Sequence, residues 1–209
     1  MPPVKTIVYI DGFNLYYGCL KGTPYKWLNP LLLCQALLPG HQIIGIRYFS
    51  ATVSARVNDP GQPIRQQTLF RALRTVPNLQ ITLGSFLSHR VTLPLAFPSP
   101  GNNLAAVIRT DEKGSDVNLA TSLLVDAFDN VFDCAVIVSN DSDLLAPVRV
   151  VRRRFGKPLG ILNPQKRPCR MLIAEATFYK KIRPAVLAAS QFPSQLTDQH
   201  GTFLKPATW

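Results

Sequence analysis

The hydrophobic positions of the chain alternate between short continuous runs and stretches with helical spacing. Short runs rich in β-branched and aromatic residues are typical of buried strands, whereas apolar positions three and four residues apart indicate amphipathic helices. Strands are predicted at 6–11, 43–54, 133–141 and 157–163, and helices at 13–20, 30–38, 63–76, 116–128 and 142–155. Strands that alternate with helices in this way build βαβ units around a mainly parallel sheet. The predicted fold class is therefore α/β.

Two segments fall outside this alternation. Residues 79–110 alternate like strands and become rich in Pro, Gly and Asn near 98–103, which predicts a hairpin insertion. Residues 189–209 have mixed polarity and no periodicity, so we expect an irregular C-terminal extension that packs back through Phe192, Phe203 and Trp209 or else is mobile. The predicted organisation is one domain over 1–188 followed by this extension.

The charge of the chain indicates a polyanionic partner. Lys and Arg total 23 against 12 acidic residues, a formal net charge of +11, and 46% of the residues are hydrophobic. A field of this sign attracts nucleic acid. The alternative is a generally basic surface with no ligand, because net charge reports on association and not on fold.

The cysteines, the missing targeting signals and one apolar segment predict the compartment and the assembly. The four cysteines lie far apart without a C-x-x-C pair, and neither a signal peptide nor a run of 18 apolar residues occurs. We expect a cytoplasmic protein with reduced cysteines and no membrane segment. The apolar 79–97 segment is a candidate homodimer contact if it is exposed.

Acidic residues lie where two predicted strands end and where one helix begins. Asp11 ends the strand at 6–11, Asp141 ends the strand at 133–141, and Asp116 begins the helix that precedes the latter strand. Their polar neighbours in sequence are Asn14, Ser139 and Asp143. In an open parallel sheet, ligands bind outside the carboxyl ends of the strands. If the strands at 6–11 and 133–141 are neighbours, the acids converge on one edge of the sheet.

Carboxylates gathered in this way favour a divalent cation. They repel one another, and burying them together is costly unless a cation neutralises them. Mg²⁺ or Mn²⁺ is the natural counter-charge, because each prefers oxygen ligands and binds through a few carboxylates plus substrate phosphate. One or two such ions activate water for phosphodiester hydrolysis. Together with the positive surface, the acids suggest a metal-dependent nuclease.

Each acid also has a purely structural explanation. Asp116, Asp141 and Asp143 lie near predicted helix N-termini, where a carboxylate stabilises the helix by about 0.3 to 1 kcal/mol through capping and the dipole. Asp11 precedes Gly12 and suits a turn. Taken singly, each acid is explained as well by capping as by metal binding. The occurrence of acids in three separate segments is what favours a metal site.

Basic and aromatic side chains provide candidate contacts with nucleic acid. Arg47, Arg65 and Arg149 are candidates for phosphate contacts, although a solvated helix face explains Arg149 as well. Tyr16, shortly after Asp11, is a candidate for stacking on a base. The chain contains no G-x-x-x-x-G-K-[ST] or G-x-G-x-x-G phosphate loop, which argues against an ATPase or a dinucleotide enzyme.

Three stretches of the chain form a specific set of motifs. They are YIDGFNLYYG at 9–18, EKGSDVNLATSLLVDAF at 112–128 and AVIVSNDSDLLAPV at 135–148. In this order and spacing they resemble the NYN domain family, in particular the LabA-like branch of the PIN-like nucleases. The similarity runs from about Thr6 to Leu162. It implies a Rossmann-like, PIN-type three-layer fold and a ribonuclease site that depends on a divalent metal.

The resemblance implies a role for each matching residue. The D-x-x-N motif falls on Asp11 and Asn14, the K-G-x-D motif on Lys113 and Asp116, and the S-x-D-x-D motif on Ser139, Asp141 and Asp143. Asp11, Asp116 and Asp141 would then bind Mg²⁺ or Mn²⁺, and Asp143 would be a fourth ligand or position the water. Asn14 and Ser139 would orient ligands or substrate. Lys113 would contact phosphate.

One departure from the family pattern affects the predicted activity. Relatives often carry a second acid on the helix at the position of Ser122, and Asp126 lies about 80° round the helix from Asp116. One carboxylate fewer weakens metal binding. The leading hypothesis is a metal-dependent endoribonuclease in which metal-activated water attacks phosphorus. The alternative is a non-catalytic RNA- or protein-binding module with a weak or vestigial site, and a third reading is a phosphatase or nucleotide hydrolase that uses the same acids.

Overall fold

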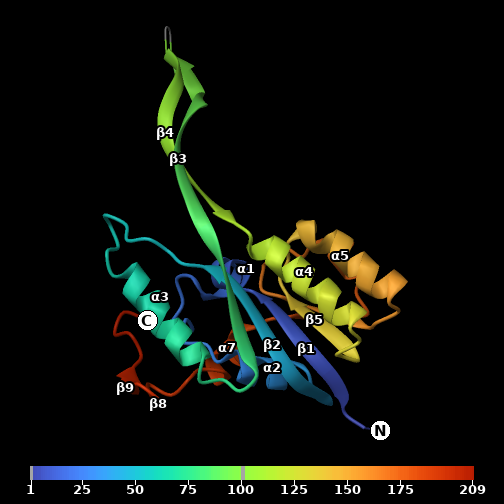
Figure 1. The fold of residues 1–209 in the computed structure, drawn as a ribbon. Coiled ribbons are helices and arrows are strands. Elements are labelled where there is room, and N and C mark those ends of the chain that lie inside the picture. The colour runs from blue at the N-terminus through green and yellow to red at the C-terminus, as the bar shows by residue number, and fades with distance from the viewer. Residues whose placement is uncertain (1, 100–101) are drawn as a thin grey trace.

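The computed structural model describes residues 2–99 and 102–209, and its centre is a twisted sheet of seven strands (Figure 1). The strand order is β4-β3-β2-β1-β5-β6-β7, and every neighbouring pair is parallel except the antiparallel pair β3–β4. The strands are β1 (Val4–Asp11), β2 (His41–Ala51), β3 (Leu79–Ser99), β4 (Asn102–Lys113), β5 (Cys134–Val138), β6 (Leu159–Asn163) and β7 (Phe178–Lys181). The predicted α/β class with a mainly parallel sheet is confirmed.

Helices cover both faces of the sheet. They are α1 (Gly12–Leu15), α2 (Pro30–Leu37), α3 (Gln62–Leu73), α4 (Ser115–Phe128), α5 (Leu145–Arg149), α6 (Arg170–Glu175) and α7 (Pro184–Ala189). Helices α1 and α5 continue as π-helical turns over Tyr16–Leu20 and Val150–Arg154, and a 3₁₀ turn over Ser142–Leu144 precedes α5. All five predicted helical segments are present. Helices α6 and α7 were not predicted, because each is too short for a periodic pattern. None of the helices in the described residues has the length and apolar character needed to cross a membrane.

The strands divide their side chains between two hydrophobic cores. In β1, Val8 and Ile10 face the core that also contains residues of α2, α3 and α7, whereas Ile7 and Tyr9 face the core that contains residues of α4, α5 and α6. Successive side chains of a strand point to opposite faces, so a strand buried on both faces reads as a continuous apolar run. This explains why the run IVYI at 7–10 is apolar throughout and why the fold has three layers.

The strand order places β1 and β5 next to each other in the sheet. Between them, the side on which the chain adds further strands changes from one to the other. From β1 the chain adds β2 and β3 on one side, and later adds β5, β6 and β7 on the other. Ile10 pairs with Val138 at the carboxyl ends of β1 and β5. The strands predicted at 6–11 and 133–141 are therefore neighbours, and the crevice above them is a topological switch point.

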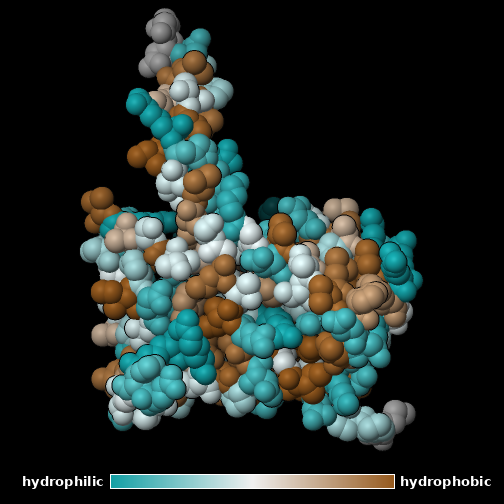
Figure 2. All heavy atoms as spheres, viewed as in Figure 1, coloured by the Kyte–Doolittle hydropathy of each residue, from teal (hydrophilic) through white to brown (hydrophobic). Residues whose placement is uncertain are grey.

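Beyond the sheet, β3 and β4 continue as a long hairpin, which we call the arm (residues 85–99 and 102–113). Leu79–Gly84 pair with β2, whereas the strand from Ser85 onward pairs with β4 alone. Gly84 is the last residue of β3 that pairs with β2. A side chain there would collide with the carbonyl oxygen of Lys113 at the end of β4. The arm rises away from the body of the molecule (Figure 1) and carries exposed apolar side chains (Figure 2), among them Phe97 and Ile108.

The C-terminal extension contains more regular structure than its sequence suggests. Its strands β8 (Gln195–Asp198) and β9 (Gly201–Leu204) form a separate two-stranded sheet. Arg71 of α3 donates to both carboxylate oxygens of Asp198, each at 2.7 Å, and its guanidinium lies 4.2 Å from the centre of the Phe203 ring. Phe192, Phe203 and Trp209 each pack edge-on against Trp27. These contacts join residues that are distant in sequence, so no local pattern predicts them.

Candidate active site at the carboxyl edge of the sheet

Asp11 lies at the end of β1 and is almost completely buried. Its carboxylate caps α1 by accepting a hydrogen bond from the backbone N–H of Asn14 at 2.9 Å, and it accepts a second from Ser139 Oγ at 2.9 Å. Burial raises the pKa of Asp11 to about 6, since removal from water disfavours the charged form and Asp116 and Asp141 repel it, while the two hydrogen bonds oppose the rise. A carboxylate held in this way favours a nearby cation.

Asp141 follows the end of β5 and is linked to Asp11 through Ser139. The buried Ser139 hydroxyl donates to Asp11 and accepts from the Asp141 backbone N–H at 3.1 Å. Asp141 also caps the next turn, where its Oδ1 accepts from the Asp143 N–H at 3.0 Å. Asn14 Oδ1 accepts from the Asn140 N–H at 3.1 Å and so joins α1 to the same turn. The polar residues of two motifs far apart in sequence thus form one hydrogen-bond network.

Asp116 enters the site from the first turn of α4. Gly114, with φ of 98°, turns the chain from β4 into this helix. Burial raises the pKa of Asp116, and the negative charges of Asp141, Glu112 and Asp143 raise it further. Three acids therefore lie near enough to repel Asp116.

Asp11, Asp116 and Asp141 line one cavity of about 420 Å³. Phe13 and Tyr17 from the segment after β1, together with Phe86, Thr110 and Glu112 from the base of the arm, form much of its wall. Phe13 packs edge-on against Phe86, with ring centres 5.6 Å apart. The three predicted ligand residues therefore converge, and the arm helps to enclose them.

The acids do not form a closed cage. Among residues 2–99 and 102–209, no three Asp, Glu, His or Cys side chains are arranged to hold a metal ion directly. Mg²⁺ typically keeps several waters and uses only one or two carboxylates. The hard oxygen donors and their mutual repulsion fit such a hydrated ion, with water bridging to the more distant acids.

Other predicted site residues lie at the margin of this cavity or away from it. Asp143 and Lys113 line an adjoining cavity of about 340 Å³ that shares Asp116. Arg47 binds Asp126 and Gln80 on the α4 side of the sheet, and Arg149 binds Glu175 at 2.9 Å. Asp126 also accepts from the Tyr9 hydroxyl at 2.7 Å, so it belongs to that cluster and not to the site. Tyr16 and Arg65 line a separate aromatic pocket beside the acids.

The structure adds residues that the sequence patterns did not single out. Glu112 lines the acidic cavity and accepts from the Ser115 N–H at 3.0 Å and from the Ser115 hydroxyl at 2.8 Å. Lys166 and Arg167 line a neighbouring cavity of about 570 Å³, which shares Asp141 with the acidic one. Asn140 donates to the Arg167 carbonyl at 3.0 Å and fixes this basic loop. The only sequence signal was the basic cluster QKRPCR at 165–170.

Comparison with known proteins assigns this arrangement to a family. The model of the NYN domain matches residues 5–183. The chain belongs to the NYN domain family. This NYN domain is 30% identical, over 99% of its length and 76% of the relative's, to 6-hydroxy-3-succinoylpyridine 3-monooxygenase HspA of Pseudomonas putida (strain DSM 28022 / S16).

A solved structure shares the fold of this NYN domain. It is a protein of unknown function from Vibrio parahaemolyticus RIMD 2210633, with a TM-score of 0.59 at 18% identity, covering 88% of this chain and 95% of that one. At this identity the similarity concerns the fold alone. The family match indicates a nuclease-like α/β architecture, whereas the curated relative is named as a monooxygenase.

Proposed function

We propose that this NYN domain, a member of the LabA-like branch, is a Mg²⁺- or Mn²⁺-dependent ribonuclease. The observation that carries the proposal is the convergence of Asp11, Asp116 and Asp141 on one cavity at the switch point of the sheet. Asp11 and Asp116 would hold the ion, with Asp141 as the third ligand and Asp143 as an outer acid. A bound divalent ion supplies a more acidic water and stabilises charge on the leaving oxygen of a phosphodiester.

The surroundings of the acids suit a single RNA strand. The cavity that contains Lys166 and Arg167 opens next to the acidic cavity, and the two share Asn14, Tyr17, Asp141 and Gln165. Basic side chains there would bind phosphates on one side of the scissile bond, while Lys113 would contact phosphate on the other side. Ser139 and Asn14 hold Asp11 and the Asp141 turn in place. The overall charge of +11 would recruit the polyanion from solution.

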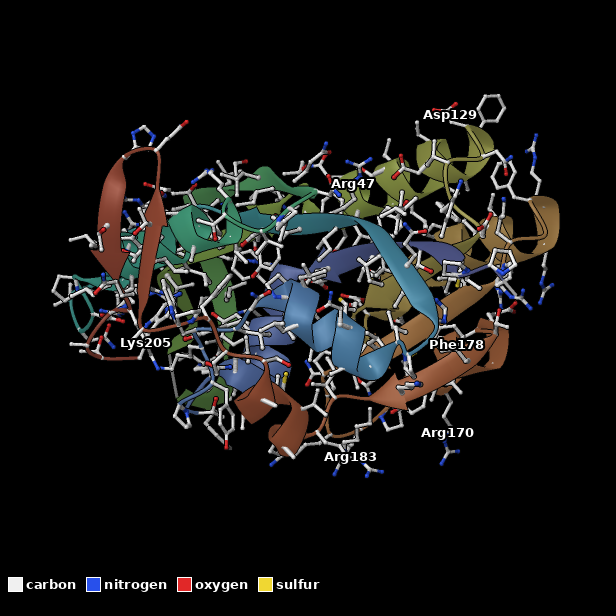
Figure 3. All side chains as sticks on the ribbon, turned by 90° about the horizontal axis from the view of Figure 1, so that it is seen from below. Arg47, Asp129, Arg170, Phe178, Arg183 and Lys205 are labelled. Carbon is white, nitrogen blue, oxygen red and sulfur yellow. The ribbon has the colours of Figure 1, made fainter. Side chains whose placement is uncertain are left out.

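Cleavage of labelled single-stranded RNA in Mn²⁺, Mg²⁺ or EDTA tests the proposal. Wild type is compared with Asp116→Asn and Asp141→Asn, and with Asp129→Asn as a matched control at the outer end of α4 (Figure 3). The expected result is metal-dependent cutting by wild type and control but not by the two site variants. Equal cutting by all four proteins would refute the assignment. RNA binding without cutting would identify a non-catalytic binding module.

A second candidate is the oxygenation of a pyridine ring, favoured by the 30% identity to the monooxygenase over nearly the whole chain. Insertion of one oxygen atom requires O₂ and a two-electron donor, with the second oxygen atom leaving as water. The test is O₂ consumption with 6-hydroxy-3-succinoylpyridine and a nicotinamide or flavin reductant. If the Asp116→Asn variant still consumes O₂ with this substrate, and the wild type does not cut RNA, this candidate is favoured over the nuclease.

A further inference from the structure

An aromatic pocket opens beside the acidic cavity. Its wall contains the rings of Phe13, Tyr16, Tyr17, Tyr48, Phe70 and Trp209. Phe13, Tyr17 and Val53 line both this pocket and the acidic cavity, so the two spaces lie on opposite sides of these residues. Aromatic walls of this kind bind flat rings by stacking, and each stacked base contributes about 1 to 3 kcal/mol.

The hydroxyls of two largely buried residues give the pocket polar character. Tyr48 and Ser50 lie two residues apart on β2, so their side chains share a face of the strand, and they are 8% and 4% exposed. Tyr48 Oη lies beside Gly12, where a Cβ would stand 2.9 Å from it. Among the described residues neither hydroxyl takes part in a hydrogen bond, and neither oxygen is completely buried. Two unpaired hydroxyls that face a largely aromatic pocket are placed to bind the polar edge of a ligand.

Two other polar residues of the pocket, Gln66 and Arg65, already have partners. Gln66 accepts from the Val53 N–H at 2.9 Å and donates to the Ala51 carbonyl at 2.9 Å. Arg65 donates to Asp59 at 2.6 Å. These contacts hold the rim of the pocket in place. Among the described residues that line it, Tyr48 and Ser50 carry the most buried polar groups without such a contact.

The size of the pocket limits the ligand. Its volume is about 90 Å³, whereas an engineered cavity that encloses benzene has roughly 150 Å³. The pocket is smaller than that cavity, so it suits one six-membered ring that enters edge-first, with the rest of the ligand outside, better than a fused double ring.

We propose that this pocket binds a single six-membered heteroaromatic ring that carries hydrogen-bonding groups, and that in an RNA substrate this ring is a pyrimidine base. The second part rests on the proposed nuclease function, because it places the adjoining phosphate at the acidic cavity. Tyr48 and Ser50 would hydrogen-bond the oxygen or nitrogen atoms of the ring, with the aromatic side chains against its faces. A free hydroxypyridine has the same chemistry, so the experiment separates the two sources.

The test is binding of UMP, CMP, AMP, GMP and free 2-hydroxypyridine in EDTA, measured by calorimetry on wild type, Tyr48→Phe and Ser50→Ala. Tyr25→Phe is the matched control, since its ring packs at the edge of the core outside this pocket. All variants are checked by near-ultraviolet circular dichroism. UMP and AMP carry the same phosphate, so a difference between them reports the base.

The expected result is at least tenfold tighter binding of UMP and CMP than of AMP and GMP, with a three- to tenfold loss in Tyr48→Phe and in Ser50→Ala and none in Tyr25→Phe. Binding of 2-hydroxypyridine but not of UMP, with the same dependence on the two hydroxyls, would support the single-ring pocket and overturn its assignment to RNA. Equal binding of purines and pyrimidines, or binding unaffected by both hydroxyl variants, would overturn the pocket itself. Because these measurements contain no metal and no cleavage step, their failure is distinguishable from failure of the nuclease proposal.

Discussion

Ser139 at the end of β5 donates a hydrogen bond to Asp11 at the end of β1, with 2.9 Å between the two oxygens and 128 positions between the residues in the chain. The same hydroxyl accepts from the Asp141 backbone N–H. One buried side chain thus sets the position of two acids from different motifs. The geometry of the candidate site depends on this link as much as on the acids.

Replacing Ser139 is expected to impair the site without removing any acid. Ser139→Ala leaves the second carboxylate oxygen of Asp11 without its donor, and loss of such a supporting hydrogen bond typically lowers metal affinity or activity about 10- to 100-fold. The measurement is Mn²⁺ affinity by calorimetry and RNA cleavage on protein shown to be folded. Ser194→Ala, an exposed serine of the extension, is the control. If the Mn²⁺ affinity of Ser139→Ala is unchanged, Asp11 does not need the hydrogen bond from Ser139 to bind the metal.

The titration of Asp11 predicts opposite effects of pH on stability and on metal binding. Because its pKa is raised from 3.8 to about 6, the folded protein holds this proton more tightly than the unfolded chain does. Its stabilising contribution, on the order of 3 kcal/mol, is complete below the unfolded pKa and is lost as pH rises through about 6. Metal binding requires the ionised form, so Mn²⁺ affinity should increase over the same range.

Thermal unfolding between pH 4 and 7, in EDTA and in Mn²⁺, checks this prediction. Wild type in EDTA should lose stability with rising pH relative to Asp11→Asn, which cannot ionise, and Mn²⁺ should restore it. Parallel pH profiles for the two proteins in EDTA would contradict the assigned titration.

Glu112 is expected to supply part of the negative charge that Ser122 does not provide. Glu112→Gln keeps an oxygen that can accept from Ser115 but removes the charge that raises the pKa of Asp116. Divalent-metal affinity should fall about fivefold, equivalent to ~1 kcal/mol for one lost charge near the ion, and Asp116 should titrate at lower pH. Calorimetry with Asp129→Asn as control measures the first effect. An affinity equal to that of wild type would place Glu112 outside the metal site.

The distal half of the arm is expected to contact a second copy of the chain. Between Arg90 and Arg109 the sequence contains no charged residue, although the whole chain carries +11, and Phe97 and Ile108 are 92% and 80% exposed. A two-stranded hairpin is marginally stable alone in water, and a neutral apolar surface suits another copy better than RNA phosphate. Stable interfaces typically bury about 1,200 to 2,000 Å² in total, and two arms packed on each other's subunits are expected to reach this range.

Sedimentation equilibrium measures this association. Wild type should dimerise, whereas Phe97→Asp and Ile108→Asp should shift the equilibrium towards monomer. Val57→Asp, which changes an exposed apolar residue outside the arm, should leave it unchanged. A monomeric wild type at 100 µM protein would exclude the arm as a self-association surface.

Much of the central fold followed from local patterns. The apolar runs of β1, β5 and β6 and the periodic stretches of α2, α3 and α4 were predictable, because a strand buried on both faces and an amphipathic helix have distinct periodicities. Helix α6, strand β7 and the pair β8–β9 were not predictable in this way. Each has only 4 to 6 residues, and its stability comes from neighbours distant in sequence.

The sequence by itself determined that Asp11, Asp116 and Asp141 lie at element ends, since each follows or begins a predictable element. It also determined the formal net charge of +11. Only the tertiary structure decided that β1 and β5 are neighbours, that Glu112 and the Lys166–Arg167 loop join the acids, and that Arg47 and Asp126 pair with each other elsewhere. It also brought Tyr48 and Ser50 against Trp209 across one small pocket. The physical reason is that strand order, side-chain pairing and cavity shape depend on contacts between segments far apart in the chain, whereas periodicity reports only on which face of an element is buried.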